Sequence, residues 1–285
     1  GASGALYAVG AAITNMWSNN VPGVQAASQA SAGGIANLNM VSDGEAQVSI
    51  AISSNVYQCL NGTDSFKDHP YKDLKAIAGL YMNPNQVVVT AKSGIQTLAD
   101  VKGKRFAVAS AGSSVYNESN AHFTAAGLKF PDDIQAEYIT FTDAADMLQN
   151  GSIDGAWIMS GAPASAVTQA LTGGARLVDI DDQLMKDLKA KYPWYASYTI
   201  KAGTYPNQDR DVRTTAVKMV MFTRGDMPED VVYNLTKTFW EHIDELGQAQ
   251  KNLKGLKPED AVKDIANVPL HRGAEKYYRE IGVLK

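Results

Sequence analysis

The chain repeats one pattern, and this repeat constrains the fold more than any other feature of the sequence. The first copy begins at GASGALY and ends at DGEAQVSIAISSN, and the second runs from SAGSSVYNESNAHF to NGSIDGAWIMSGAP. Each copy holds a Gly/Ser loop, an apolar helix, a second helix that ends near Gly44 or Gly151, and a buried strand. Because two copies are too few for a solenoid, the repeat predicts two α/β lobes of similar build.

Small, uncharged loops occupy matching places in the two predicted lobes. SSNVY follows the strand VSIAI, SAGSSVYN follows RFAVA, SGAP follows AWIM, and GASGALY opens the first helix. In open α/β sheets, ligands bind outside the carboxyl ends of the strands. We therefore expect these four loops to face one another across a binding cleft.

The chemistry of these loops suits an anion. Backbone N–H groups at a helix start, together with the helix dipole, attract an anion without any arginine. The candidate ligand-binding residues share a place at a loop or strand end: Ser3, Gly4, Tyr7, Gln29 (which ends a predicted strand over residues 24–29), Ser53, Asn55, Ser113, Ser114, Val115 and Gly161. The plain alternative is that the glycines serve only tight turns.

The start of the chain departs from the average composition. Residues 1–42 contain no Asp, Glu, Lys, Arg or His, although roughly ten charged residues would be usual in a stretch of this length. One interpretation is a surface that recognises a small solute through neutral hydrogen bonds. The other is a well-buried helix or a chance fluctuation, and the sequence favours neither.

The two lobes need connecting segments. An apolar run crosses near residues 84–90, and the chain returns through the β-rich stretch that follows AGTYPNQD. Two crossings predict a discontinuous first lobe, residues 1–87 plus 216–285, with the second lobe at 88–215. The amphipathic helices near the carboxyl end should pack on the first lobe, and such a layout suits hinge closure around a ligand.

Composition excludes several classes of partner. The formal net charge of −4 over 285 residues argues against nucleic acid. No apolar run approaches the roughly 18 residues of a membrane span, so no direct membrane insertion is expected. Cys59 is the only cysteine, which rules out an internal disulfide. The chain begins at Gly1 rather than Met, so we expect a mature or trimmed product from which any export signal was removed.

Catalytic motifs are missing from the sequence. It has no G-x-S-x-G nucleophile elbow and no P-loop, and His69, His122, His242 and His271 show no metal-ligand spacing. We predict no catalytic residue, no metal and no cofactor, and interpret His271 as a helix-start or packing histidine. A small-molecule enzyme or a sensor domain on the same scaffold is the alternative. An enzyme would need a general acid or base in the loops, where only Glu118 comes close.

Six stretches resemble a known family in both content and order. GASGALYAVGAAITNMW, DGEAQVSIAISSNV, GIQTLADVKGKRFAV, DAADMLQNGSIDGAWIMSGAP, AGTYPNQD and NVPLHRGAEKYYREIG are similar to segments of TAXI-type solute receptors of tripartite ATP-independent periplasmic (TRAP) transporters. The resemblance covers essentially the whole chain, and AGTYPNQD and PLHRGAEKYY are its most specific parts. The sequence departs from the family pattern at Ser3 and Ala5 and at Ser114 and Val115.

The resemblance implies a type II periplasmic-binding-protein-like fold, with two α/β lobes joined by two crossing segments. It also implies a periplasmic receptor that captures a small organic anion, such as glutamate, glutamine or a related dicarboxylate. The receptor would deliver this solute to the membrane subunits of a TRAP transporter driven by a sodium gradient. A monomer is expected, with no nucleic-acid partner.

Overall fold

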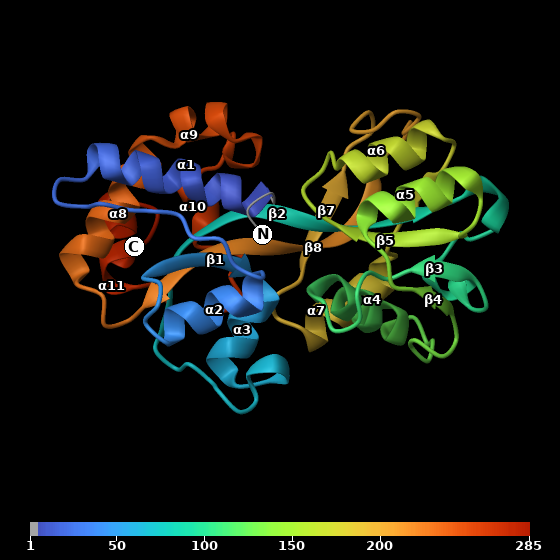
Figure 1. Ribbon diagram of the computed structural model, residues 1–285, viewed down its shortest axis with the longest axis horizontal. Helices are drawn as coiled ribbons and strands as arrows, with labels where there is room; N and C mark the ends of the chain where they lie inside the picture. The colour runs from blue at the N-terminus through green and yellow to red at the C-terminus, as the bar shows by residue number, and fades with distance from the viewer. Residues whose placement is uncertain (1–4) are drawn as a thin grey trace. The chain divides into compact units, whose positions relative to one another are not determined.

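The computed structural model describes residues 5–285, which form two compact units (Figure 1). Unit 1 comprises Gly1–Met82 and Val217–Lys285, and unit 2 comprises Asn83–Ala216. The chain passes between the units twice, once within β2 (Leu74–Val89) and once within β8 (Val212–Arg224). Unit 1 is therefore built from both ends of the sequence, and unit 2 is inserted into it.

Unit 1 contains an antiparallel pair of strands covered by helices. β1 (Val48–Ile52) pairs with the second half of β8, from Val48 opposite Thr223 to Ile52 opposite Met219. β1 stands at one end of the strand order, so its other edge has no strand neighbour among the described residues. The helices are α1 (Ala5–Asn20), α2 (Gly34–Ser42), α3 (Ser53–Asn61), α8 (Glu229–Glu241), α9 (Ile243–Ala249), α10 (Pro258–Ala261) and α11 (Arg272–Glu280), with 3-10 turns at Asp64–Phe66 and Lys251–Leu253.

The carboxyl-terminal helices pack tightly within unit 1. His271 begins α11, where its Nδ1 accepts a hydrogen bond from the Gly273 amide at 3.0 Å. The sequence-based interpretation of His271 as a helix-start histidine is therefore confirmed. A side chain at Gly273 would place its Cβ 2.4 Å from the Glu229 carbonyl oxygen, so glycine lets α11 lie directly against α8. The Tyr278 hydroxyl then donates to the Ile77 carbonyl of β2 at 2.8 Å.

Unit 2 is a mixed sheet between two layers of helices. The second half of β2 pairs antiparallel with β5 (Gly155–Met159) and β6 (Arg176–Val178), and β3 (Arg105–Ala107) pairs parallel with β5 and β4 (Gln135–Glu137). β7 (Ala196–Ile200) pairs antiparallel with the first half of β8. α5 (Phe141–Asn150) and α6 (Ser165–Thr172) cover one face of the sheet, and α4 (Ser114–Ala125) and α7 (Asp182–Lys191) lie on the other (Figure 1). The 3-10 turns are Ala91–Ser93 and Leu98–Val101.

Local sequence signals set the helix ends in unit 2. Ser113, Thr140 and Asp181 cap α4, α5 and α7 by accepting a hydrogen bond from a backbone amide of the first turn. Gly151 ends α5 with φ 76°, the left-handed conformation that glycine adopts at low cost. The predicted helix end at Gly151 is confirmed.

The strand predicted over residues 24–29 is wrong. This segment is extended, and its residues alternate between exposed and half-buried as in a strand, but the structure gives it no ladder partner among the described residues. The Ser18 hydroxyl of α1 takes the place of a neighbouring strand at Ala26, where it accepts from the amide at 2.8 Å and donates to the carbonyl at 3.0 Å. An extended, alternating segment is not a strand by itself, because a strand also needs a neighbour that supplies the ladder hydrogen bonds.

Candidate functional site

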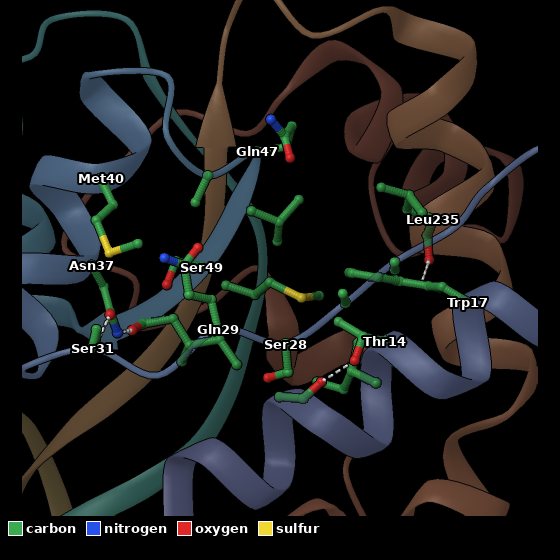
Figure 2. A pocket seen from close by; sticks show the side chains of 18 of the residues that line it. Thr14, Trp17, Ser28, Gln29, Ser31, Asn37, Met40, Gln47, Ser49 and Leu235 are labelled. Carbon is green, nitrogen blue, oxygen red and sulfur yellow. Dashed lines mark hydrogen bonds between the residues drawn. The ribbon is translucent and has the colours of Figure 1, made fainter. Parts of the chain in front are cut away.

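Unit 1 contains a cavity of about 460 Å³, here called the unit 1 groove (Figure 2). Its walls are α1, the extended segment 24–29, α2, β1 and α8. Apolar side chains of the lining include Trp17, Met221 and Leu235. Polar side chains of the lining include Gln29, Asn37 and Ser49. The volume lies within the range of small-molecule pockets.

Hydrogen bonds within unit 1 already occupy several polar groups of the groove. Asn37 Nδ2 donates to the Ile50 carbonyl of β1 at 2.9 Å, and the Ser31 hydroxyl bonds Asn37 Oδ1. Trp17 Nε1 donates to the Leu235 carbonyl at 3.0 Å, which ties α1 to α8. Among the described residues that line the groove, Glu45 alone carries a charge. The groove therefore suits an uncharged occupant better than an anion.

The candidate residues of the first repeat separate into two places in unit 1. Tyr7 and Gln29 line the unit 1 groove. Ser53 and Asn55 lie instead in the first turn of α3, directly after β1, and are 0% and 3% exposed. Ser53 Oγ accepts from the Lys218 amide at 3.3 Å, and Asn55 Nδ2 donates to Gln58 Oε1 at 3.1 Å. Ser3 and Gly4 lie outside the described residues.

In unit 2, three of the candidates form the start of α4. Ser113 is the N-cap and accepts from the Tyr116 amide at 3.1 Å, and Ser114 and Val115 are the first two helical residues. The loop before them turns sharply, with φ 62° at Ala109 and 76° at Gly112. This loop carries no charged side chain from Ala109 to Asn117. A twelve-residue helix that begins here offers N–H groups and the positive end of its dipole.

Gly161 lies in the bend between β5 and α6, and two buried side chains hold this bend in place. Gln86 Nε2 donates to the Ser160 carbonyl at 2.9 Å. The Tyr205 hydroxyl accepts from the Ala164 amide at 2.9 Å and bonds Gln86 Oε1. Tyr205 belongs to the AGTYPNQD stretch. The tyrosine of that motif thus fixes the loop that contains Gly161.

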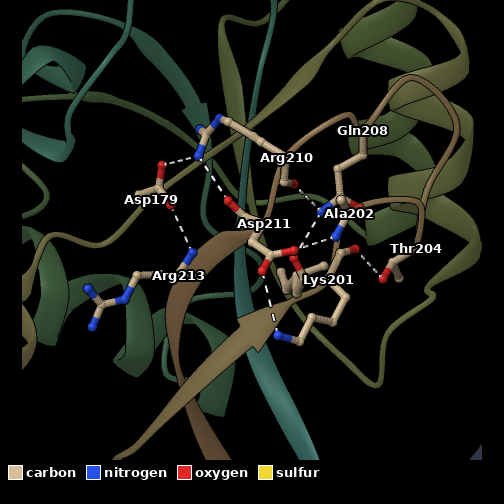
Figure 3. A network of polar contacts seen from close by, with 9 residues as sticks. Asp179, Lys201, Ala202, Thr204, Gln208, Arg210, Asp211 and Arg213 are labelled. Atoms are coloured by element: carbon tan, nitrogen blue, oxygen red, sulfur yellow. Dashed lines mark hydrogen bonds and ion pairs between the residues drawn. The ribbon is translucent and has the colours of Figure 1, made fainter.

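The turn that carries Tyr205 is itself fixed by a surface network (Figure 3). Asp211 accepts from the Ala202 amide at 2.9 Å and lies 3.5 Å from Lys201 Nζ. Asp179 Oδ2 forms an ion pair with Arg210 Nη1 at 2.6 Å. Asp179 Oδ1 accepts a hydrogen bond from the Arg213 amide at 2.8 Å. These cations are more than half exposed, so each pair contributes little to stability.

A closed hydrogen-bond network lies beneath α4. Asn85 Nδ2 of β2 donates to Glu118 Oε2 at 2.9 Å and to Thr215 Oγ1 of β8 at 3.0 Å, and Asn85 Oδ1 accepts from Trp157 Nε1 at 2.8 Å. His122 Nε2 lies 2.7 Å from Thr215 Oγ1, and its Nδ1 lies 2.7 Å from the Glu118 carbonyl. A neutral His122 with the proton on Nδ1 satisfies every one of these bonds.

Burial controls the protonation of this network. Desolvation raises the pKa of Glu118 to about 7, partly opposed by the hydrogen bonds from Asn85 and Tyr195. Desolvation lowers the pKa of His122 to about 4. Both groups are therefore held toward their neutral forms. Glu118, the one residue that a catalytic alternative could use, is only 3% exposed and bonded to Asn85 and Tyr195.

The residues that position the bend before α6 and hold α4 were not among the candidates predicted from the sequence. Asn85, Gln86, Thr215 and Tyr205 are all at most 3% exposed. Asn85 and Gln86 stand in the middle of an apolar run, and polar residues inside a buried strand were the available signal.

Within residues 5–285, no group of three or more His, Cys, Asp or Glu side chains is placed to hold a metal ion. No helix in that range has the length and apolarity to cross a membrane.

The fold is that of the periplasmic solute-binding proteins. The TctC solute-binding protein from Polaromonas is 17% identical, with a TM-score of 0.60 over 100% of this chain and 96% of that one. The periplasmic aliphatic sulphonate-binding protein SsuA from Escherichia coli is 18% identical, with a TM-score of 0.51 over 99% and 91%. The alkanesulfonate-binding protein SsuA from Xanthomonas axonopodis pv. citri, bound to MOPS, is 18% identical, with a TM-score of 0.50 over 93% and 82%.

Sequence comparison gives the family. Residues 1–282 match the NMT1-like family, and the chain belongs to it. The solved structures share their fold with this chain. That fold is α/β, and the expected fold class is confirmed. The solved structures named above are solute-binding proteins rather than enzymes.

Proposed function

We propose that this protein is an extracytoplasmic solute receptor that binds a small organic anion and delivers it to the membrane subunits of a TRAP-type transporter. Glutamate, glutamine or a related dicarboxylate is the solute class that the resemblance to TAXI receptors favours. The receptor is proposed to act in the periplasm, as a monomer and without turnover. The strand-end loops of both lobes, with boundaries near residues 87 and 216, are proposed to bind the solute together.

The observation that carries this proposal is the chemistry of the loops at the strand ends. α3, α4 and α6 each begin within a few residues of a buried strand, after β1, β3 and β5. The loops before α4 and α6 and the first turn of α3 contain small or neutral polar residues and no cation. Helix amides and dipoles can stabilise a carboxylate under these conditions. Gln86 and Tyr205 support the geometry by holding the bend before α6, and Asn85 bonds Glu118 of α4.

The test begins with the purified protein. Denaturation followed by mass spectrometry of the released small molecules identifies any bound solute. The ligand-free protein is then melted with L-glutamate, L-glutamine, succinate, an aliphatic sulfonate and L-lysine. A cognate anion at 100 times its Kd should add about 2.7 kcal/mol to the free energy of unfolding, and L-lysine should add nothing. A panel in which no anion raises the melting temperature would contradict the proposal.

The same samples test the enzyme alternative. Overnight incubation with each solute, followed by chromatography, should return it unchanged. Sustained conversion by the pure protein would require a catalytic site, whereas Glu118, the one acid in the candidate loops and helices, is buried and bonded. A sensor would instead bind the solute without supporting its uptake by a membrane transporter. Uptake of the labelled solute by vesicles that contain the transporter subunits, with and without this protein, distinguishes a receptor from a sensor.

A further inference from the structure

We infer that Glu118 couples binding of the proposed anion at the start of α4 to the uptake of a proton by its own buried carboxyl. The inference rests on the proposed function, because it takes the anion site at residues 113–115 as given and names the regulation of that site. It concerns only the part of the site that lies in unit 2. Its consequence is an affinity for the anion that falls as the pH rises through neutrality.

The first observation is the position of the Glu118 carboxyl on α4. Glu118 is the fifth residue of a helix that begins at Ser114, so the two Cα atoms lie roughly 6 Å apart along the helix axis. Side chains on a helix tilt toward its amino terminus, which brings the carboxyl closer to the first turn. Residues 109–128 contain no other charged side chain apart from His122. A carboxylate at Glu118 is therefore the one negative charge that this segment sets against an anion at the helix start.

The second observation is the burial of this carboxyl in a closed hydrogen-bond network. Glu118 is 3% exposed, so solvent screens little of its charge. Asn85 Nδ2 donates to Glu118 Oε2 at 2.9 Å, and the Tyr195 hydroxyl also bonds the carboxyl. A tyrosine hydroxyl donates to a carboxylate and accepts from a carboxylic acid. Both protonation states of Glu118 thus keep their hydrogen bonds, and a proton can bind or leave without rearrangement of the network.

The other titratable groups of the network do not compensate the charge of Glu118. They are His122 of α4 and Tyr195, which precedes β7. Desolvation lowers the pKa of His122 to about 4 and raises the pKa of Tyr195 well above its ordinary value. Both groups are therefore neutral between pH 6 and pH 8, and neither supplies a positive charge to the carboxylate in this range.

The elements around α4 supply no compensating charge either. α7, β5 and the 3-10 turn Leu98–Val101 contact α4, and β5 and β7 carry no charged residue. The charged residues of α7 and of the turn are all exposed: Asp100, Asp182, Lys186, Asp187, Lys189 and Lys191. On the crossing strands, the charged residues of unit 1 are Lys75, Lys218 and Arg224. Arg213 of unit 2 pairs with Asp182, so within the described part of the chain this carboxyl has no ion-pair partner.

These observations set the sign of the coupling. Desolvation raises the pKa of Glu118 to about 7, so the carboxyl is neutral below this pH and leaves the helix dipole free to attract an anion. Above it the carboxylate repels the anion, and over roughly 10 Å at an effective dielectric constant of about 20 this repulsion weakens binding about tenfold. Linkage is reciprocal. A bound anion therefore raises the pKa of Glu118 further, and binding near pH 7 takes up protons.

The experiment measures binding of L-glutamate by calorimetry at pH 6, 7 and 8. Glu118→Gln mimics the neutral acid, because its amide bonds Asn85 and Tyr195 but cannot ionise. We expect the Kd to rise about fivefold from pH 6 to pH 8 in the parent and to change much less in Glu118→Gln, since any titration of L-glutamate itself is common to both. Saturating L-glutamate should also consume protons from a weakly buffered solution of the parent at pH 7, and none from the variant.

Glu137→Gln is the matched control. It makes the same exchange in unit 2 at a partly exposed carboxylate of β4 that pairs with Arg105, and its pH dependence should equal that of the parent. L-Glutamate that binds the parent equally at pH 6 and pH 8 would overturn the inference and leave the proposed function standing. The parent's pH dependence retained in a folded Glu118→Gln would assign the linkage to another group.

A different result would overturn the proposed solute as well. If L-glutamate binds none of these proteins at any pH, the proposed solute is contradicted and the inference loses its basis. The melting temperature of each variant shows whether it is folded. Proton uptake by the parent supplies a second readout that does not depend on the folding of Glu118→Gln, and its absence on binding of L-glutamate at pH 7 would contradict the coupling directly.

Discussion

Asn85 and Gln86 are consecutive residues of β2, and their amide side chains bind opposite layers of unit 2. Asn85 reaches α4 through Glu118 Oε2 at 2.9 Å, whereas Gln86 reaches the bend before α6 through the Ser160 carbonyl at 2.9 Å. Alternation along a strand places neighbouring side chains on opposite faces. One dipeptide therefore contacts both α4 and the bend before α6, and it lies beside the point at which the chain passes from unit 1 into unit 2.

Tyr205→Phe should destabilise unit 2. The substitution removes the hydroxyl that accepts from the Ala164 amide and bonds Gln86, and it leaves buried polar groups without a partner. The expected loss is about 1–3 kcal/mol in the free energy of unfolding by urea. Tyr198→Phe is the matched control, because the Tyr198 hydroxyl forms no hydrogen bond within the described part of the chain. Equal losses in the two variants would contradict the role assigned to Tyr205.

The pH dependence of stability should separate Glu118 from His122. Glu118 has a raised pKa of about 7 in the folded protein, so its contribution is full below its ordinary pKa of 4.5 and is lost as the pH rises toward 7. His122 has a lowered pKa of about 4 against 6.5, so the folded state loses stability as the pH falls from 6.5 to 4. Between about pH 4.5 and 6.5 the two effects oppose each other.

Single substitutions should reveal the two opposing slopes. In Glu118→Gln the His122 effect remains, and the free energy of unfolding should rise with pH across this window relative to the parent. In His122→Gln the Glu118 effect remains, and the free energy should fall with pH. Urea titrations at half-unit pH steps give both profiles. Parallel profiles for the parent and the two variants would show that neither buried group titrates differently in the folded and unfolded states.

Substitutions at Ser113 should separate folding from binding. Its hydroxyl caps α4, so Ser113→Ala should cost about 1 kcal/mol of stability. Ser113→Asp keeps a capping oxygen and should melt close to the parent, but it adds a negative charge where the proposed anion binds. We expect Ser113→Asp to weaken binding of the cognate anion at least tenfold, measured by calorimetry. Unchanged affinity in Ser113→Asp would exclude the α4 start from the site.

Anion binding should depend weakly on salt. Lys201, Arg210 and Arg213 are already paired with Asp211, Asp179 and Asp182, and the candidate loops contain no cation. A ligand held by amides in a closed site is screened much less than an exposed ion pair. We expect the Kd to change less than about threefold between low and moderate salt. A steep loss of affinity would require a cationic side chain in the site.

The sequence by itself determined several helix ends, because these depend on neighbours within a few residues. Gly151 ends α5 and His271 begins α11 through contacts inside one turn. The same local logic placed Ser113, Ser114 and Val115 at a loop before a helix. It assigned Ser113 to a ligand, however, and the structure gives its hydroxyl to the Tyr116 amide.

Only the tertiary structure decided which segments pair and which polar residues act together. Residues 24–29 have the pattern of a strand, yet a strand forms only where a neighbouring segment supplies the ladder hydrogen bonds. The sequence of residues 24–29 does not identify that neighbour. Asn85, Glu118 and Thr215 are separated by 33 to 130 residues along the chain, and their hydrogen bonds form only after β2, α4 and β8 are packed. Buried polar networks are non-local, since each member is satisfied by partners that folding brings to it.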